Sequence, residues 1–289
     1  MNSPFKCIGL FIRKDDPVME NAVEQITEFL LSQSLSVFVN EPLAFLPELE
    51  VISISDFPKQ CDLTMAIGGD GTILSASRAL SGTGLPIVGV NIGRLGFLAD
   101  VTLAKLEPQL SEILSGNYRE DTRILMHATI LGEKIQEVGK AMNDVVVHAH
   151  QSLHMIEFET YINGRFLNSQ RADGLVVATP TGSTAYAMSA GGPILDVDLE
   201  ALVLASVCPH ALSNRPLVVA ANSTIDIVIS DSNTTSAMVT CDGRPGHILQ
   251  PGDTIRIQRQ PSTITLLHLE DHDHYSILRA KLEWGRKLT

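Results

Sequence analysis

The spacing of apolar residues changes along this chain, from alternating strand and helix patterns before about residue 120 to strand patterns after it. Before residue 120, β-branched and apolar runs predict strands at CIGLFI (7–12), VFVN (37–40), VISIS (51–55), LTMAI (63–67) and LPIVGVN (85–91). Helical spacing lies between these runs, for example from Pro17, which favours a first helical turn, through Ala22, Ile26 and Leu30. Strands separated by helices pair in parallel, so residues 1–120 are predicted to form a layered α/β domain.

The residues after 120 alternate between apolar and polar with the period of a half-buried strand, as in HMIEFETYI (154–162), STIDIVIS (223–230) and DTIRIQRQ (253–260). Turn signals interrupt these runs, including Asn163–Gly164 and the PGD of residues 251–253. The pattern predicts a mainly antiparallel β domain over residues 121–267. Helical spacing reappears in YSILRAKLEWGRK (275–287), so residues 268–289 are expected to return to the first domain.

Composition limits the classes of partner. The chain has 289 residues and a formal net charge of −12, which argues against nucleic acid because such binding needs a basic surface. We see no leader pattern and no run of 18 apolar residues, so we expect a cytoplasmic protein with no membrane partner. The four cysteines are widely and irregularly spaced, which favours free thiols over disulfides or a zinc site.

The stretch AIGGDGTILS (66–75) places three glycines around one aspartate, between a predicted strand and a predicted helix. Ligands of open α/β sheets bind at this edge, and the first amides of a helix favour phosphate. The stretch matches neither the dinucleotide fingerprint nor a Walker loop, because Leu74 replaces the third glycine and no Gly-Lys-Ser/Thr follows. Asp70 therefore has two interpretations, a cap of the helix or a base that deprotonates a hydroxyl attacking a phosphoryl group.

The chain resembles the NAD kinases of Gram-negative bacteria in a series of motifs. GGDGT alone is shared with lipid kinases and phosphofructokinases, but the following segments occur in the NAD kinase order: NIGRLGFLAD (91–100), NDVVVH (143–148), HMIEFE (154–159), ADGLVVATPTGSTAYAMSAGGPI (172–194), CPHALSNRPLV (208–218) and CDGR (241–244). A lipid kinase would lack the TPTGSTAY block, and a phosphofructokinase would need sugar-phosphate motifs that are not found. A nucleotide sensor without activity would not need Asp70 and Asn143–Asp144.

The resemblance implies a reaction and a set of site residues. The reaction is transfer of the γ-phosphate of ATP to the 2′-hydroxyl of the adenosine ribose of NAD, with Mg²⁺ or Mn²⁺ accompanying ATP. Asp70 corresponds to the group that accepts the hydroxyl proton, with Gly71 as a backbone contact beside it. Asn143 and Asp144 correspond to the pair that holds the ribose hydroxyls, with Asp where many relatives have Glu.

Further NAD-binding residues also follow from the resemblance. The adenine end is matched by Thr184, Ala185, Tyr186, Ala187, Met188 and Ser189. The nicotinamide end is matched by Arg171, typical of members that prefer NAD over NADH, and by Asp173; His154 matches a dinucleotide contact. Arg244 stands where relatives often have Gln, which makes its contact a weaker expectation.

Assembly, the ATP site and metal binding are the remaining points on which the sequence bears. The family forms homodimers or homotetramers, so we expect a homo-oligomer. The sequence does not locate the ATP site or decide whether polyphosphate replaces ATP. We expect no protein metal centre, and we interpret His148, His150, His268, His272 and His274 as solvated or structural.

Overall fold

The computed structural model describes residues 3–13, 17–93, 96–132, 134–150 and 154–284, without the side chains of residues 17 and 18. The chain divides into two compact units. The first unit comprises Met1–Thr122 with Ile264–Thr289, and the second comprises Arg123–Thr263. The second unit is therefore inserted within the sequence of the first, and its boundaries fall inside two strands.

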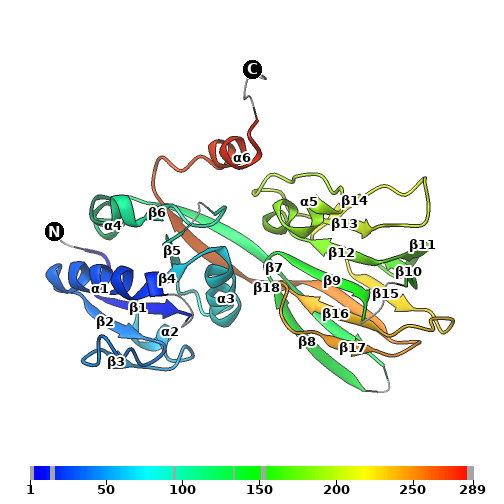
Figure 1. The fold of residues 1–289 in the computed structure, drawn as a ribbon, viewed down its shortest axis with the longest axis horizontal. Helices are drawn as coiled ribbons and strands as arrows, with labels where there is room; N and C mark the ends of the chain where they lie inside the picture. The colour runs from blue at the N-terminus through cyan, green and yellow to red at the C-terminus, as the bar shows by residue number, and fades with distance from the viewer. Residues whose placement is uncertain (1–2, 14–16, 94–95, 133, 151–153, 285–289) are drawn as a thin grey trace. The chain divides into compact units, whose positions relative to one another are not determined.

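The first unit alternates strands and helices (Figure 1). Its elements are β1 (Cys7–Ile12), α1 (Pro17–Ser32), β2 (Ser36–Val39), β3 (Glu50–Val51), α2 (Phe57–Gln60), β4 (Leu63–Gly68), α3 (Asp70–Leu80), β5 (Ile87–Asn91), β6 (Val101–Thr102), the 3₁₀ helix η1 (Leu103–Lys105), α4 (Leu106–Leu114), the end of β18 (Thr254–His268) and α6 (His274–Leu282). The strands lie in the order β18–β5–β4–β1–β2–β3, with β6 beside β5, and pair in parallel. The predicted parallel sheet and the returning C-terminal helix are confirmed.

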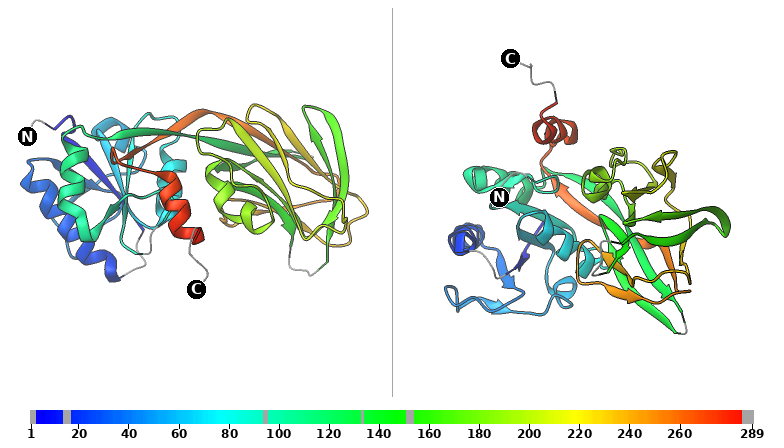
Figure 2. Two further views of the ribbon diagram at one scale, coloured as in Figure 1. Left: turned by 90° about the horizontal axis from the view of Figure 1, so that it is seen from above. Right: turned by 45° about the vertical axis from the view of Figure 1, so that its right-hand side comes forward.

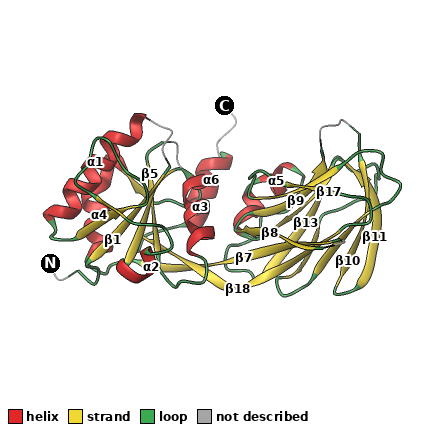
Figure 3. Cartoon of the chain, turned by 90° about the horizontal axis from the view of Figure 1, so that it is seen from below, coloured by secondary structure: helices red, strands yellow, loops and turns green. Residues whose placement is uncertain are grey.

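Helices cover both faces of this parallel sheet (Figure 3). On one face, apolar side chains of α1 and α4 pack with alternate residues of β1, β4 and β5 in a single core. On the other face, Phe57 of α2 lies against Gly9, and Ile73 of α3 lies against Gly89. This layering explains why β4 and β5 are buried along their whole length, and it places the start of α3 at the carboxyl end of β4.

One local prediction differs from the structure. The run VISIS was predicted as a strand, but only Glu50–Val51 pairs with β2, and the chain then turns toward α2. Short β-branched runs satisfy strand propensity without providing a ladder partner, and tertiary context decides.

The second unit consists mainly of antiparallel strands in two sheets (Figure 2). Its elements are β7 (Arg119–Leu131), β8 (Ile135–Ala141), β9 (Asp144–Ala149), β10 (Ile156–Ile162), β11 (Arg165–Ala172), β12 (Gly174–Ala178), the 3₁₀ helix η2 (Thr181–Thr184), α5 (Tyr186–Ser189), β13 (Ala201–Val207), β14 (Leu217–Ala220), β15 (Ile225–Ile229), β16 (Ala237–Cys241), β17 (His247–Leu249) and the start of β18. One sheet has the order β14–β13–β12–β9–β16–β17, and the other contains β11–β10–β15–β18 with β7 and β8.

The inner faces of these two sheets share one apolar core. Ile156 and Phe158 of β10 are fully buried with Val145 and Val147 of β9, as the alternation in the sequence predicts. The β10–β11 hairpin turns at Asn163–Gly164, where φ is 52° and 74°. The predicted antiparallel fold is confirmed. No helix in the described part of the chain is long and apolar enough to cross a membrane.

Candidate active site

Asp70 is held by the backbone of a neighbouring segment of the first unit. It is the first residue of α3, and Gly69 occupies the N-cap position without any side-chain cap. The carboxylate of Asp70 instead accepts hydrogen bonds from the amides of Phe97, at 2.8 Å, and Leu98, at 3.3 Å. The backbone approaches so closely that a Cβ at Gly96 would lie 1.9 Å from Asp70 Oδ1. The cap interpretation is therefore wrong. Two amides occupy part of the carboxylate's acceptor capacity and leave room for a hydroxyl donor.

The glycine turn beside Asp70 is open. Gly71 is exposed, and the nearest side-chain atom to a Cβ built on it is Nη1 of Arg13, at 3.9 Å. Free amides and the dipole of α3 favour an anion here, and Arg13 adds a positive charge. Arg13 is a site residue that the motifs did not predict, although its position directly after β1, at the carboxyl edge of a parallel sheet, was a signal for it.

In the second unit, Asn143 and Asp144 lie where β8 ends and β9 begins, and Asp242 fixes their backbone. Oδ1 of Asp242 accepts from the amides of Asn143 (2.8 Å) and Asp144 (3.2 Å), and Oδ2 accepts from the amide of Met142 (3.1 Å). The amide of Asp242 donates to the carbonyl of Asp144 at 2.9 Å. The Asp242 carboxylate thus accepts hydrogen bonds from three consecutive amides, and the Asp242 amide donates one hydrogen bond to the same segment.

The opposite side of Asn143 contacts the TPTGST turn. The Thr179 amide donates to the Asn143 carbonyl at 2.9 Å, and a Cβ at Gly182 would lie 2.0 Å from that carbonyl oxygen. The Oδ1 atom of Asn143 is buried and lacks a hydrogen-bond partner among the described residues. An unsatisfied buried acceptor is costly, so this amide is suited to receive a hydrogen bond from a ligand.

Asp144 lies in an electrostatic environment that favours its neutral form. Its side chain is buried, and burial together with the negative charge of Asp242 raises its pKa to about 7; the Tyr186 amide acts in the opposite direction. The carboxyl therefore changes protonation near neutral pH, which suits a group that exchanges hydrogen bonds or a proton with a ribose hydroxyl.

The TPTGST turn leads directly into the residues predicted to surround adenine. Residues 181–184 form η2, and residues 186–189 form the short helix α5. Tyr186 and Ser189 are exposed, and Thr184, Ala185 and Met188 are half-buried. Ala187 differs, because its side chain is fully buried in a small core with Val146 and Val176. The Ala187 side chain therefore packs in the core beneath this segment. Only its backbone and the neighbouring residues are placed to contact a ligand.

The residues predicted for the nicotinamide end, Arg171 and Asp173, lie near the end of β11 and have different partners. Arg171 Nε lies 3.6 Å from Glu157 Oε1 on the adjacent strand β10. Asp173 instead accepts from the Cys208 thiol, whose pKa it raises. The charge of Arg171 is thus balanced within its own sheet.

Two further predicted contacts are exposed. His154 precedes β10, next to residues 151–153, which lie outside the described residues. Arg244 lies in the turn after β16 that also holds Asp242, and its amide donates to the Cys241 carbonyl at 3.1 Å. The sequence motif CDGR was noted as a match, yet the residue in it with the most contacts to the Asn143–Asp144 turn is Asp242, which we did not predict.

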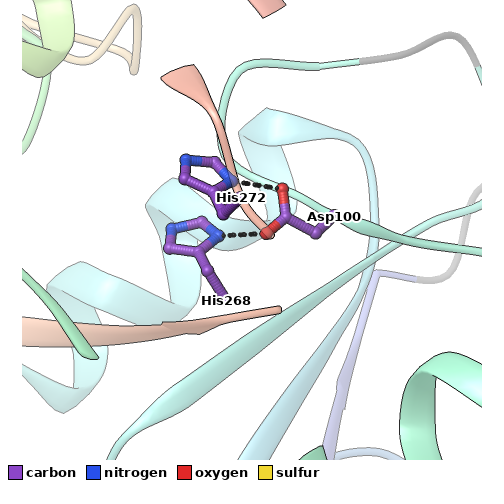
Figure 4. Close-up of side chains that lie close together, drawn as sticks. All are labelled: Asp100, His268 and His272. Carbon is purple, nitrogen blue, oxygen red and sulfur yellow. Dashed lines mark hydrogen bonds and ion pairs between the residues drawn. The ribbon is translucent and has the colours of Figure 1, made fainter. Parts of the chain in front are cut away.

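A separate cluster in the first unit joins Asp100, His268 and His272 (Figure 4). Nδ1 of His268 lies 2.7 Å from one Asp100 oxygen, and Nδ1 of His272 lies 2.7 Å from the other. The two imidazoles are stacked, with centroids 4.0 Å apart and planes inclined by 23°. His268 is buried, so of the two interpretations, solvated or structural, the structural one applies to it.

The stacking of these rings decides what the cluster can bind. Two nearly parallel rings direct their in-plane lone pairs side by side, whereas ligation of one ion needs the lone pairs to converge. The geometry fits two N–H donors on one carboxylate. Burial acts to raise the pKa of Asp100, but the bonds from His268 and His272 outweigh it and hold that pKa well below its usual range. An oxygen-seeking ion such as Mg²⁺ would also not select two imidazole nitrogens.

A glycine turn at the carboxyl edge of a parallel sheet and a carboxylate–amide turn beside a small helix define a nucleotide-binding α/β protein. Comparison with known families identifies it further. Residues 8–118 match the ATP-NAD kinase N-terminal domain, and residues 142–269 match the ATP-NAD kinase C-terminal domain. The chain belongs to the NAD kinase family. This decides against the lipid kinase and phosphofructokinase alternatives.

Known relatives cover the whole chain. It is 51% identical to the NAD kinase of Nitrosococcus oceani over 292 aligned positions, with both chains covered completely. It is 45% identical to that of Hahella chejuensis, covering 97% of this chain and 96% of the relative. The solved structure of yeast NADH kinase with NADH is 25% identical, with a TM-score of 0.88 over 100% of this chain and 90% of that one. An Archaeoglobus fulgidus NAD kinase, solved with ATP, shares the fold at 24% identity, with a TM-score of 0.74 over 96% of this chain and 98% of that one.

Proposed function

We propose that this chain transfers the γ-phosphate of ATP to the 2′-hydroxyl of the adenosine ribose of NAD, which yields NADP and ADP. The observation that carries the proposal is the Asn143–Asp144 turn, where a buried acceptor with no hydrogen-bond partner in the described part of the chain lies beside a buried carboxyl in a member of the NAD kinase family. An acceptor and a carboxyl at adjacent positions can hold two vicinal hydroxyls in a fixed orientation, which lowers the entropic barrier to attack.

Asp70 is proposed to accept the proton of the attacking hydroxyl. The two amides on its carboxylate fix its orientation, and a base in a loose phosphoryl-transfer transition state needs position more than basicity. Gly71 and Arg13 are proposed to contact phosphates. Asp144 is a second candidate for the base, because a pKa of about 7 lies near the pH at which such a group is most effective.

The remaining residues are proposed to contact NAD. Thr184, Ala185, Tyr186, Met188 and Ser189 would surround the adenosine, Ala187 would support them, and Arg171, Asp173, His154 and Arg244 would contact the rest of the dinucleotide. These roles are supported by exposure or partial exposure of every side chain in the group except Ala187.

The divalent cation is proposed to enter with ATP as part of the substrate. Mg²⁺ usually keeps several waters and binds through phosphates and one or two carboxylates, so it needs no dedicated protein cage. The cation supplies charge neutralisation on the transferred phosphoryl group.

The location and assembly of the protein are proposals as well. We propose a cytoplasmic homodimer or homotetramer, with residues 1–120 and 268–289 forming the domain of the glycine turn and residues 121–267 forming the NAD-binding domain. Light scattering coupled to gel filtration tests the oligomeric state.

The activity itself is tested with purified protein, NAD and γ-labelled ATP. We expect label to appear in NADP only when Mg²⁺ or Mn²⁺ is present. Parallel reactions with diacylglycerol as acceptor and polyphosphate as donor define specificity. Label in diacylglycerol, with none in NADP, would refute the proposed reaction.

A further inference from the structure

Asp242 lies in the turn after β16 in a backbone conformation that side chains other than Asn and Asp seldom adopt. Its φ is 48°, in the left-handed region. This conformation directs the carboxylate toward the start of β9, where it receives the amides of Met142, Asn143 and Asp144. A carboxylate that accepts three amides fixes the positions of the residues that donate them, since each charge-assisted bond is stronger than a neutral one.

The contact is reciprocal, which distinguishes it from an ordinary turn. The Asp242 amide donates to the Asp144 carbonyl at 2.9 Å, while β16 and β9 pair in register at Cys241 and Val145. Hydrogen bonds in both directions therefore connect the turn after β16 to Asn143 and Asp144, the pair proposed to hold the ribose hydroxyls. A shift of Asp242 moves Asn143 and Asp144 with it.

We propose that Asp242 is a positioning residue of the phosphotransfer reaction, which acts through Asn143 and Asp144 by fixing their backbone. This inference rests on the proposed NAD kinase reaction.

The groups that surround Asp144 show that Asp242 also affects the charge of its carboxyl. Asp242 provides a negative charge from the turn after β16, and Tyr186 of α5 provides a backbone amide. The facing strand β12 brings only Gly174, Leu175 and apolar residues up to Ala178. Burial and the Asp242 charge together raise the pKa of Asp144 to about 7. Removal of the Asp242 charge leaves only burial to raise it.

Two substitutions separate position from charge. Asp242→Asn removes the charge, and it also loses one of the three bonds because the amide nitrogen cannot accept from an N–H group. Asp242→Glu keeps the charge but displaces it along a longer side chain. Asp253→Asn is the matched control, because the Asp253 carboxylate lies in another turn of the same unit, where, among the described residues, it accepts the nearby Gln250 amide at 2.8 Å.

The test measures kcat, KM for NAD and the pH profile of kcat/KM, together with NAD binding by calorimetry. Asp242→Asn should raise KM for NAD by about tenfold or more, through displaced ribose contacts. It should also move the acidic limb of the profile to lower pH. Asp242→Glu should raise KM but leave the limb at its wild-type pH, and Asp253→Asn should change neither.

An Asp242→Asn enzyme with wild-type KM and an unmoved acidic limb would overturn the inference, as would equal effects of Asp242→Asn and Asp253→Asn. Calorimetry keeps the inference distinct from the proposed function. If wild-type protein binds NAD but makes no NADP, the reaction fails while weaker binding by Asp242→Asn still supports the positioning role; unchanged binding refutes it.

Discussion

Because two backbone amides bind the Asp70 carboxylate, we expect its replacement by asparagine to affect both the stability of the fold and the turnover of the enzyme. The amide group of Asn accepts through one oxygen only, so one of the Phe97 and Leu98 donors would lose its partner. Asp70→Asn should therefore lower the free energy of unfolding by about 1–3 kcal/mol. As the proposed base, Asp70 also contributes to turnover, so kcat should fall by about 10²- to 10⁴-fold, with a smaller change in KM. Chemical denaturation and steady-state kinetics on the same preparation measure both.

Asp62 provides the control for that variant. Its Oδ2 atom accepts from the Lys6 and Cys7 amides, at 2.7 and 3.1 Å, and one amide oxygen can take over both bonds. Asp62→Asn should retain wild-type kcat. If Asp70→Asn also retained near-normal kcat, the base would have to be Asp144.

Arg171 is proposed to favour NAD over NADH, and its ion pair with Glu157 limits the size of the effect. The Arg171 side chain is 60% exposed, and exposed charges contribute only about 0.2–1 kcal/mol. Arg171→Ala should lower the NAD/NADH ratio of kcat/KM by about two- to fivefold. Arg165→Ala, at the other end of β11, should leave the ratio unchanged. Equal ratios for wild type and Arg171→Ala would leave Arg171 without a role in selectivity.

The end of β18 and the start of α6 are tied to Asp100 by a pH-dependent cluster. The neighbouring Asp100 and Asp121 carboxylates raise the pKa of His268 against the effect of burial. Its stabilisation is complete below the unfolded pKa, about 6.5, and is lost as pH rises through the higher folded pKa. The lowered pKa of Asp100 acts oppositely, because its stabilisation is lost as pH falls below about 4. We expect the cluster to stabilise the fold most between about pH 4 and 6.5.

Replacement of His268 by asparagine removes this titration while keeping a side-chain N–H donor near Asp100. In wild-type protein the unfolding free energy contains a part that falls as pH rises above about 6.5, and His268→Asn should lack it. His127→Asn is the control, because His127 contacts the exposed Glu137 at 3.3 Å and contributes little. A His268→Asn protein with the wild-type pH dependence would show that this part arises elsewhere.

The elements that the sequence predicted correctly are those in which local pattern and tertiary environment agree. The alternation in residues 156–162 and the Asn163–Gly164 turn specify a hairpin with one buried face, and the structure contains it. The prediction of a strand at VISIS was wrong, because a single apolar run does not show whether a neighbouring strand is present to pair with it. Each site carboxylate contacts residues far away in the sequence. The partners of Asp70 are 27 and 28 positions away, those of Asp100 are 168 and 172 positions away, and those of Asp242 are 98 to 100 positions away. No local sequence pattern predicts contacts over such separations.

The core of the second unit is complete within its own residues, although β7 and β18 continue beyond its boundaries. Among the described residues, the apolar cluster between its sheets, with the partly buried side chains packed against it, runs from Ile124 to Ile257. The β7–β8 pairing covers residues 126–131, and β18 pairs with β15 through residues 254–257. The apolar contacts that stabilise this unit therefore remain when the chain is cut at residues 122 and 264.

We predict that a fragment of residues 123–263 folds cooperatively and binds NAD, because it contains Asn143, Asp144, Asp242 and the segment from Thr184 to Ser189. It should make no NADP with ATP and Mg²⁺, since Asp70 and the glycine turn belong to the first unit. Its affinity for NAD should be lower than that of the full chain, because contacts from the first unit are missing. Circular dichroism during urea denaturation and calorimetric titration with NAD are the measurements, with Asp242→Asn in the same fragment as the control. A cooperative fragment with no detectable NAD binding would show that the second unit alone is not the NAD-binding domain, and the dinucleotide contacts would then have to be sought first around Gly71 and Arg13.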